Sequence, residues 1–169
     1  MANNVKVFNP LEYFAILTEK NKLCKANKFK AAYCSGPDNI EGLMAEYRKT
    51  ENFIVIDDMT DNNVHNNRPG WFTKSVYTVW VLASTTYNNP EKTKERMNLC
   101  RRIFKQFLSR MIADKDKMKY GNGMDYLELN RVYYKELGRY SFNGATGLYF
   151  MIEHDIPEDL RFNEDEWEE

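Results

Sequence analysis

Apolar side chains recur every three or four positions between residues 97 and 112, which is the spacing of one buried stripe on a helix. Just upstream, residues 76–83 carry β-branched, aromatic and other apolar side chains on both faces of an extended segment, which favours a strand. Asn89 offers a capping oxygen and Pro90 suits the first helical position. The pattern therefore predicts one long strand and one long helix within residues 71–112, around which the rest of the chain is arranged. The helical stripe consists of Met97, Cys100, Ile103, Phe104, Phe107, Leu108, Met111 and Ile112.

The N-terminal part is predicted to be mainly helical. Asn9 and Pro10 mark the start of a first helix that reaches about residue 25, and residues 38–47 have the cap and apolar spacing of a shorter helix. Between them, residues 29–34 alternate in polarity and precede a Ser-Gly-Pro turn, which fits either an edge strand or the end of the first helix. Residues 53–56 then form a compact, apolar strand.

Residues 57–70, with the sequence DDMTDNNVHNNRPG, show no apolar period and are rich in turn-forming side chains. The sequence predicts a long loop here, joining two strands that pair as an extended hairpin. Loops of this length are uncommon in compact domains unless they have a function. We therefore treat this loop as a candidate contact surface.

The C-terminal half continues the sheet. Residues 114–119 form a charged exit from the long helix, and residues 126–137 alternate as in a strand with one partly wet face. A turn region rich in glycine, residues 138–147, leads to an apolar strand over residues 148–152, which Pro157 ends.

These elements predict an α+β fold: a largely antiparallel, four-stranded sheet with a long helix packed on one face and additional N-terminal helices. A chain of 169 residues with 43% hydrophobic side chains fits a single domain, residues 1–169. We divide it into a helical N-terminal part (1–50), an α+β core (51–157) and an acidic tail (158–169).

Composition narrows the function classes. The 24 basic and 25 acidic side chains nearly cancel, so no global field would draw the protein onto nucleic acid or a membrane. No apolar run approaches the length of a membrane span, and the N-terminus lacks the apolar core of a signal peptide, so we expect a protein made in the cytoplasm. The three cysteines are far apart and form no CxxC pair, which favours core or surface thiols.

The candidate catalytic residues do not form the pattern of a recognisable site in the sequence. His65 lies near Asp57, Asp58 and Asp61, but Met59 stands where a calcium loop would need an oxygen ligand. His154 is expected on the surface of a strand, and the glycines of residues 121–123 and 144–147 lack the GK[ST] of a phosphate loop. We therefore expect no enzyme, no cofactor and no metal.

Charge is unevenly distributed along the chain. Residues 92–110 carry seven positive side chains against Glu95, whereas residues 153–169 carry nine acidic side chains against Arg161. The basic helix of one copy can pair with the acidic tail of the next in head-to-tail contact. Such contacts form a ring when the rotation between neighbouring copies adds up to a full turn. DNA binding by the basic helix is the competing use, although no aromatic stacking platform is interleaved with its cations.

Four segments carry a resemblance to a known family: GWFTKSVYTVWVL, ERMNLCRRIFKQFLSRM, YKELGRYSFNGATGLYFMIEHDIP and the closing DEW. Together they resemble tail-terminator or tail-completion proteins encoded in bacteriophages and prophages of Bacteroides-like bacteria. The resemblance covers about residues 53–167.

The resemblance implies a small α+β structural protein of the virion, made in the cytoplasm of the bacterial host and without catalytic residues. Such proteins form a ring, commonly a hexamer, at the tail-to-head junction, where they contact the tail tube protein and the head or neck connector proteins. DNA would only pass through the ring. Residues 1–50 are longer than a minimal terminator needs, so another neck or connector role stays open.

Three groups of side chains are then expected to contact the tube or a neighbouring subunit. They are Asp61, Asn63, His65 and Arg68 of the predicted loop, Arg101, Arg102 and Lys105 of the basic helix, and Glu164, Asp165 and Trp167 of the tail.

Overall fold

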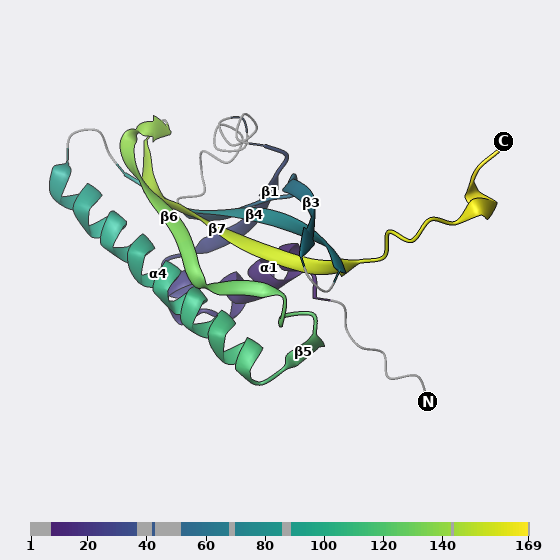
Figure 1. Ribbon diagram of the computed structural model, residues 1–169. Helices are drawn as coiled ribbons and strands as arrows, with labels where there is room; N and C mark the ends of the chain where they lie inside the picture. Colours follow the sequence, from purple (N-terminus) through teal and green to yellow (C-terminus); the bar gives the residue numbers. More distant parts are fainter. Residues whose placement is uncertain are drawn as a thin grey trace.

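The computed structural model describes residues 8–36, 42, 52–67, 70–85, 89–142 and 144–168. The fold is α+β, with a mixed sheet of six strands and a long helix, α4, against one face (Figure 1). Its elements are α1 (Pro10–Lys20), α2 (Lys22–Ala26), β1 (Phe29–Cys34), β2 (Asn52–Asp57), β3 (Asp61–Asn67), β4 (Gly70–Ser84), α4 (Pro90–Asp116), β5 (Lys119–Asn122), β6 (Leu127–Phe142), β7 (Ala145–Glu158) and the 3₁₀ turn η1 (Glu164–Glu166).

Strand β4 is the axis of the sheet, whose order is β1-β2-β4-β7-β6. One edge of β4 pairs with β7 along almost its whole length, from Trp71 to Ser84. The other edge is shared, because β3 pairs with its first half and β2 with its second half. All of these pairings are antiparallel, and only β1 and β2 run parallel.

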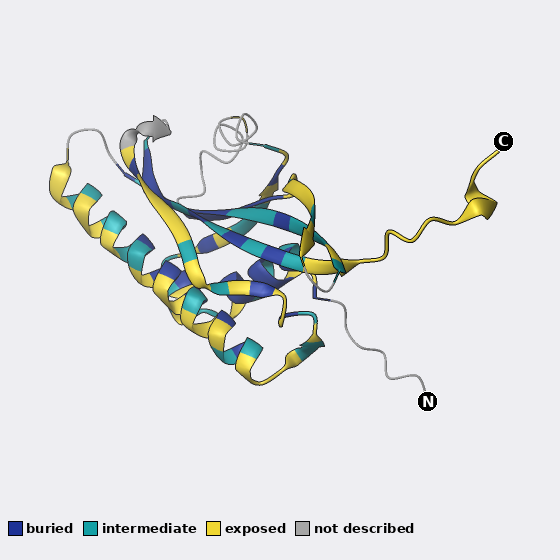
Figure 2. Ribbon diagram, viewed as in Figure 1, coloured by how far each residue is buried: buried dark blue, intermediate teal, exposed yellow. Residues whose placement is uncertain are grey.

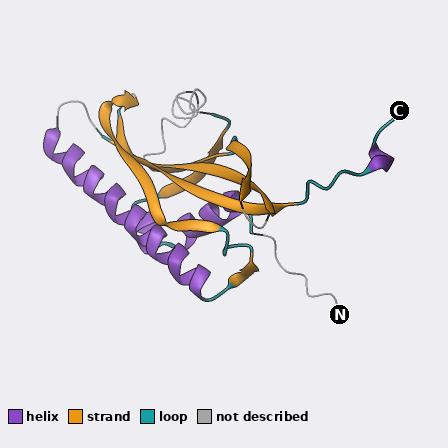
Figure 3. Cartoon of the chain, viewed as in Figure 1, coloured by secondary structure: helices purple, strands orange, loops and turns teal. Residues whose placement is uncertain are grey.

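The predicted centre of the fold is confirmed. The side chain of Asn89 accepts a hydrogen bond from the Lys92 N–H at 2.9 Å, and α4 begins at Pro90. In the stripe of α4, Met97 and Leu108 are partly buried and Ile112, at the C-terminal end, is 43% exposed. The other members of the stripe are buried: Cys100, Ile103, Phe104, Phe107 and Met111. Figure 3 shows α1 and α4 together on one side of the sheet.

The predicted loop over residues 57–70 is wrong in its main part, because residues 61–67 form strand β3. Strand β2 reaches only the second half of β4, so the edge of its first half needs another partner for its N–H and C=O groups. Strand β3 supplies that backbone ladder. Six of its seven residues are exposed, which explains why the segment shows no apolar period.

The predicted sheet of four strands was also too small. Residues 29–34 form the edge strand β1, and the first helix is interrupted at Asn21, whose side chain accepts a hydrogen bond from the Cys24 N–H and caps α2. The shorter helix predicted over residues 38–47 falls almost entirely outside the described residues.

The predicted turn region over residues 138–147 is shorter than expected. Strand β6 continues to Phe142, and β7 already begins at Ala145. Gly147 therefore lies within β7, where a Cβ would overlap the carbonyl of Val81 on the neighbouring strand. The glycine allows the close approach of β7 to β4.

The main core lies between the sheet and the helices, and Figure 2 shows buried residues on the strands and on turns of the helices. Phe14 of α1, Phe107 of α4 and Phe150 of β7 are each about fully buried there. A smaller apolar cluster lies on the other face of the sheet. Its buried residues are Cys34, Phe53, Val55, Trp80, Leu82 and Leu137.

Candidate interaction site

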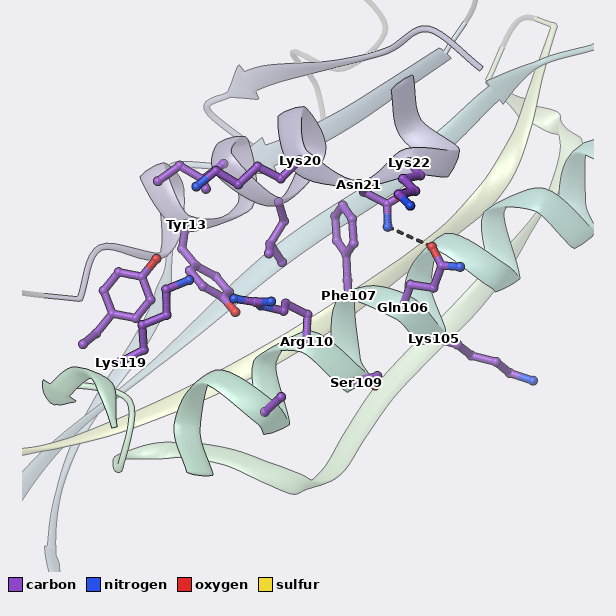
Figure 4. Close-up of a pocket in the computed structure, with 14 residues that line it drawn as sticks. Tyr13, Lys20, Asn21, Lys22, Lys105, Gln106, Phe107, Ser109, Arg110 and Lys119 are labelled. Atoms are coloured by element: carbon purple, nitrogen blue, oxygen red, sulfur yellow. Dashed lines mark hydrogen bonds between the residues drawn. The ribbon is translucent and has the colours of Figure 1, made fainter. Parts of the chain in front are cut away.

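A groove of about 620 Å³ runs between α1 and α4 on the helical side of the molecule (Figure 4). We call it the α1–α4 groove. Its floor includes Leu17 of α1 and Phe107 of α4, both buried, and Phe107 stacks on Phe14 with ring centroids 6.4 Å apart. The floor is therefore apolar and held by the main core.

Hydrogen bonds between α1 and α4 mark the two ends of the groove. At one end the Tyr13 hydroxyl donates to Asp114 Oδ2 at 3.0 Å. At the other end the Asn21 amide donates to Gln106 Oε1 at 2.8 Å (Figure 4). Because the start of α1 meets the end of α4, the two helices run antiparallel. The two bonds fix the separation of the helices at both ends.

At the end of the groove near Tyr13, Asp114 is the common partner of the surrounding polar and charged side chains. Its carboxylate is 2% exposed, lies 2.8 Å from Arg110 Nη2 and 3.4 Å from Lys119 Nζ, and accepts the Tyr13 hydrogen bond. Burial alone would raise the pKa of Asp114, but the hydrogen bonds from Arg110 and Tyr13 and the charge of Lys119 outweigh it and lower the pKa. The pKa of Tyr13 is raised, by burial first and by the hydrogen bond to Asp114 second. Asp114 is therefore an ionised, buried anchor.

The rim of the groove is strongly positive. Five of its lining residues are cationic and none is acidic: Lys20, Lys22, Lys105, Arg110 and Lys119. Arg110 and Lys119 share the single carboxylate of Asp114, whereas Lys20, Lys22 and Lys105 form no ion pair with any described residue. The groove therefore combines an apolar floor with an excess of about four positive charges, which suits an acidic ligand with an apolar side chain.

The three predicted contact residues of the basic helix lie in different environments. Arg101 forms a bidentate pair with Glu136 of β6, with Nε and Nη2 at 2.7 and 2.6 Å from the two carboxylate oxygens. Arg102 is exposed beside a separate, more polar hollow, and Lys105 lies on the rim of the α1–α4 groove. Of these three residues, only Arg102 and Lys105 form no ion pair with a described residue.

The predicted loop residues lie on β3. Asp61 and Asn63 are exposed, and Arg68 lies outside the described residues. His65 Nε2 lies 2.8 Å from Asp155 Oδ1 of β7, and the His65 ring stacks on Phe72 of β4 at 5.8 Å.

An ion pair lies beside the contact of His65 with Asp155, between Lys74 of β4 and Glu153 of β7 at 2.6 Å. The four side chains of the two pairs are each about one third exposed, and they link β3, β4 and β7 across the face of the sheet away from the helices. Among the described residues, no group of three or more His, Cys, Asp or Glu is placed to hold a metal ion.

The prediction of a surface position for His154 is wrong, because this residue is 4% exposed. Its Nε2 donates a hydrogen bond to the Gly123 carbonyl at 2.9 Å, and its ring meets Phe8 edge-on. Burial lowers the pKa of His154, so the neutral ring is favoured. The three cysteines are buried too, and burial raises the pKa of each thiol to about 12, which disfavours the reactive thiolate.

The predicted tail residues are all exposed. Beyond Glu158 the chain leaves the end of the sheet and extends away from the domain (Figure 1). The hydrogen bonds of residues 159–168 with other described residues all stay within this segment. Within it, the turn η1 brings the rings of Phe162 and Trp167 to 6.1 Å, although these side chains are 72% and 70% exposed.

The sequence predicted α4, the tail and a helix beginning at Pro10, but not the packing of α1 on α4. Lys20 and Lys22 lie far from Lys105 and Lys119 in the sequence, and the antiparallel packing of α1 on α4 gathers them around one groove. Asp114, read as part of a charged exit, is the buried anchor of that packing. Its position four residues after Arg110 was the available signal, since this spacing aligns two charges on one helix face.

No protein-family model matches the chain, and no curated protein matches it either. Among the described helices, none has the length and apolar character that crossing a membrane requires.

Proposed function

We propose that this protein is a structural component of a phage virion that assembles into a ring at the junction of tail and head, as a tail terminator or tail-completion protein. Its partners would be further copies of itself, the tail tube protein and the head or neck connector proteins. The observation that carries the proposal is the separation of opposite charges, with an acidic, aromatic tail held off the domain and a basic groove between α1 and α4.

Such a molecule favours contacts between unlike surfaces. A contact between two different patches repeats from copy to copy and produces either a closed ring or an open filament. The segments that resemble tail terminators also include the centre of the fold, since GWFTKSVYTVWVL lies in β4 and ERMNLCRRIFKQFLSRM in α4.

The test is assembly of the full chain, alone and with tail tubes. We expect size-exclusion chromatography with light scattering to show oligomers, or negative-stain microscopy to show rings on tube ends. The tubes are required because some ring proteins assemble only on the tube that they cap. Tube ends that stay bare at high protein concentration would contradict the proposal, whether the free chain is a monomer or an oligomer.

A terminator and another neck protein differ in the particles made without them. Tubes of abnormal length with unattached heads would support the terminator role. Tubes of normal length beside unjoined heads would instead place the protein among the connectors.

The cations of α4 also favour a second candidate, an accessory protein that binds DNA. In that case DNA affinity should fall steeply with salt, because each phosphate contact releases counterions. Replacing Arg101, Arg102 and Lys105 with Ala should then weaken DNA binding and reduce the salt slope. Unchanged retention of DNA by this variant would remove the candidate.

A further inference from the structure

We propose that the C-terminal segment of one copy, residues 159–169, binds in the α1–α4 groove of a neighbouring copy. The inference rests on the proposed function in one respect, that copies of the chain associate. It adds the two surfaces, their chemistry and the direction of the contact.

The charges of the two surfaces are complementary. Residues 159–168 carry five carboxylates and one arginine, three of the carboxylates in succession in η1 (Glu164–Glu166). The groove offers Lys20, Lys22 and Lys105, which have no ion-pair partner among the described residues. Bringing the two together would neutralise both, and charge complementarity of this kind selects partners and accelerates their encounter.

The apolar groups match as well. Phe162 and Trp167 form an exposed aromatic pair, which is costly to leave in water, while Leu17 and Phe107 provide an apolar floor. The groove follows α1 from Tyr13 to Asn21, a rise of about 12 Å. This length accommodates the aromatic pair and the acidic turn between its members. Buried aromatic anchors surrounded by charged groups are the usual centre of a tight protein contact.

The geometry favours a neighbouring copy over the same copy. The last residue of β7, Glu158, pairs with Trp71 in the β-ladder and accepts a hydrogen bond from the Thr73 hydroxyl at 2.8 Å. These contacts hold the start of the tail along the direction of β7, which points away from the domain (Figure 1). The segment therefore projects from the domain, where a neighbouring copy can bind it.

A direct test measures binding of a synthetic peptide, fluorescently labelled and spanning residues 159–169. The full-length receptor carries E164K, D165K and E166K, so that its own tail does not compete. We expect saturable binding that weakens with salt. Adding K20E, K22E and K105E to the receptor should weaken it about 100-fold, because three attractive charges become repulsive.

A matched control is the same receptor with K25E, K94E and K135E, three exposed lysines outside the groove. It has the same net charge as the groove variant and should bind the peptide within about 3-fold of the receptor without these changes. Equal loss in both variants would show a long-range charge effect and overturn the proposal. A peptide with F162A and W167A should lose most of its affinity, and unchanged binding of that peptide would also overturn the proposal.

A mixing experiment separates docking between copies from docking within one copy. The groove variant (K20E, K22E, K105E) and the tail variant (E164K, D165K, E166K) should each be monomeric alone, because groove and tail have the same sign. When mixed, every groove meets a tail of opposite sign, so oligomers should return in light scattering. The unsubstituted chain should be oligomeric under the same conditions. Docking within one copy predicts instead that the unsubstituted chain is monomeric, and that result, or no recovery on mixing, would overturn the proposal.

Failure of this inference differs from failure of the proposed function. If both variants alone still form rings on tail tubes, the groove and tail are not the contact, although the ring role stands. If the peptide binds the groove and mixing restores oligomers while tube ends remain bare, the contact stands and the virion role fails.

Discussion

The two faces of the sheet place charged side chains in contrasting settings. On the helical face, Asp114 is almost completely buried and serves as the common partner of Tyr13, Arg110 and Lys119. On the opposite face, Lys74 and Glu153 form an ion pair in which each side chain is about one third exposed. An ionised group in a low-dielectric site requires all its partners, whereas water replaces a lost partner at the surface. The helical face should therefore be intolerant of substitution, and the opposite face tolerant.

The largest expected effect is that of Asp114→Ala. Its removal leaves the Tyr13 hydroxyl buried without an acceptor and Arg110 and Lys119 without their shared anion. We expect a loss of about 3 kcal/mol in the free energy of unfolding, measured by urea denaturation. Asp116→Ala, two residues along the same helix and exposed, is the control and should change it by less than about 0.5 kcal/mol. Equal effects of the two substitutions would contradict the assignment of Asp114 as an anchor.

Tyr13→Phe removes one hydrogen bond of the same cluster and keeps the ring. Because the acceptor is charged and Arg110 and Lys119 still neutralise it, the expected loss is about 1.5 kcal/mol by urea denaturation. Tyr33→Phe, at an exposed position on β1, should cost less than about 0.5 kcal/mol. A loss below that of the control would mean that the α1–α4 contact does not depend on this bond.

The two histidines lie on opposite faces of the sheet, which allows a test by pH. The folded pKa of His154 is lowered from its ordinary 6.5 by burial, so below pH 6.5 the unfolded chain gains a proton that the folded chain resists. Stability should therefore fall as pH falls below 6.5. His154→Gln, which keeps an N–H donor for Gly123, should remove this part of the slope in urea denaturation across pH 5 to 7.

His65→Gln is the matched control, because it leaves His154 in place on the helical face. The slope should survive in that variant. If instead the slope disappears in His65→Gln and persists in His154→Gln, the assignment of the pH dependence to His154 is wrong.

The long elements of the fold were predictable because their sequence signals are local. The stripe of α4 repeats over four turns, and Asn89 and Pro90 mark its start within two residues. Strand β3 was not predictable in this way. It is held by the backbone ladder to β4 and buries little, so its Asn-rich sequence resembles a loop.

The candidate site was predictable only in part, and for a related reason. A run of cations on α4 and a run of acids in the tail are visible in the sequence, so one side of the groove and its proposed ligand were anticipated. The other side depends on which face of α1 meets α4. That choice is fixed by long-range contacts such as Tyr13 with Asp114, 101 residues apart, to which no local pattern points.

The smallest expected effect concerns the ion pair of Lys74 and Glu153 on the open face. The short 2.6 Å separation and the raised pKa of Lys74, caused first by its hydrogen bond to Glu153, show that the charges interact. Partial exposure limits what that interaction contributes, because water solvates either charge when the other is removed. We expect Lys74→Ala, Glu153→Ala and the double variant to give a coupling energy of about 0.5 kcal/mol at low salt, and less at high salt. A coupling energy above about 2 kcal/mol would show that the open face depends on its ion pairs as strongly as the helical face depends on Asp114.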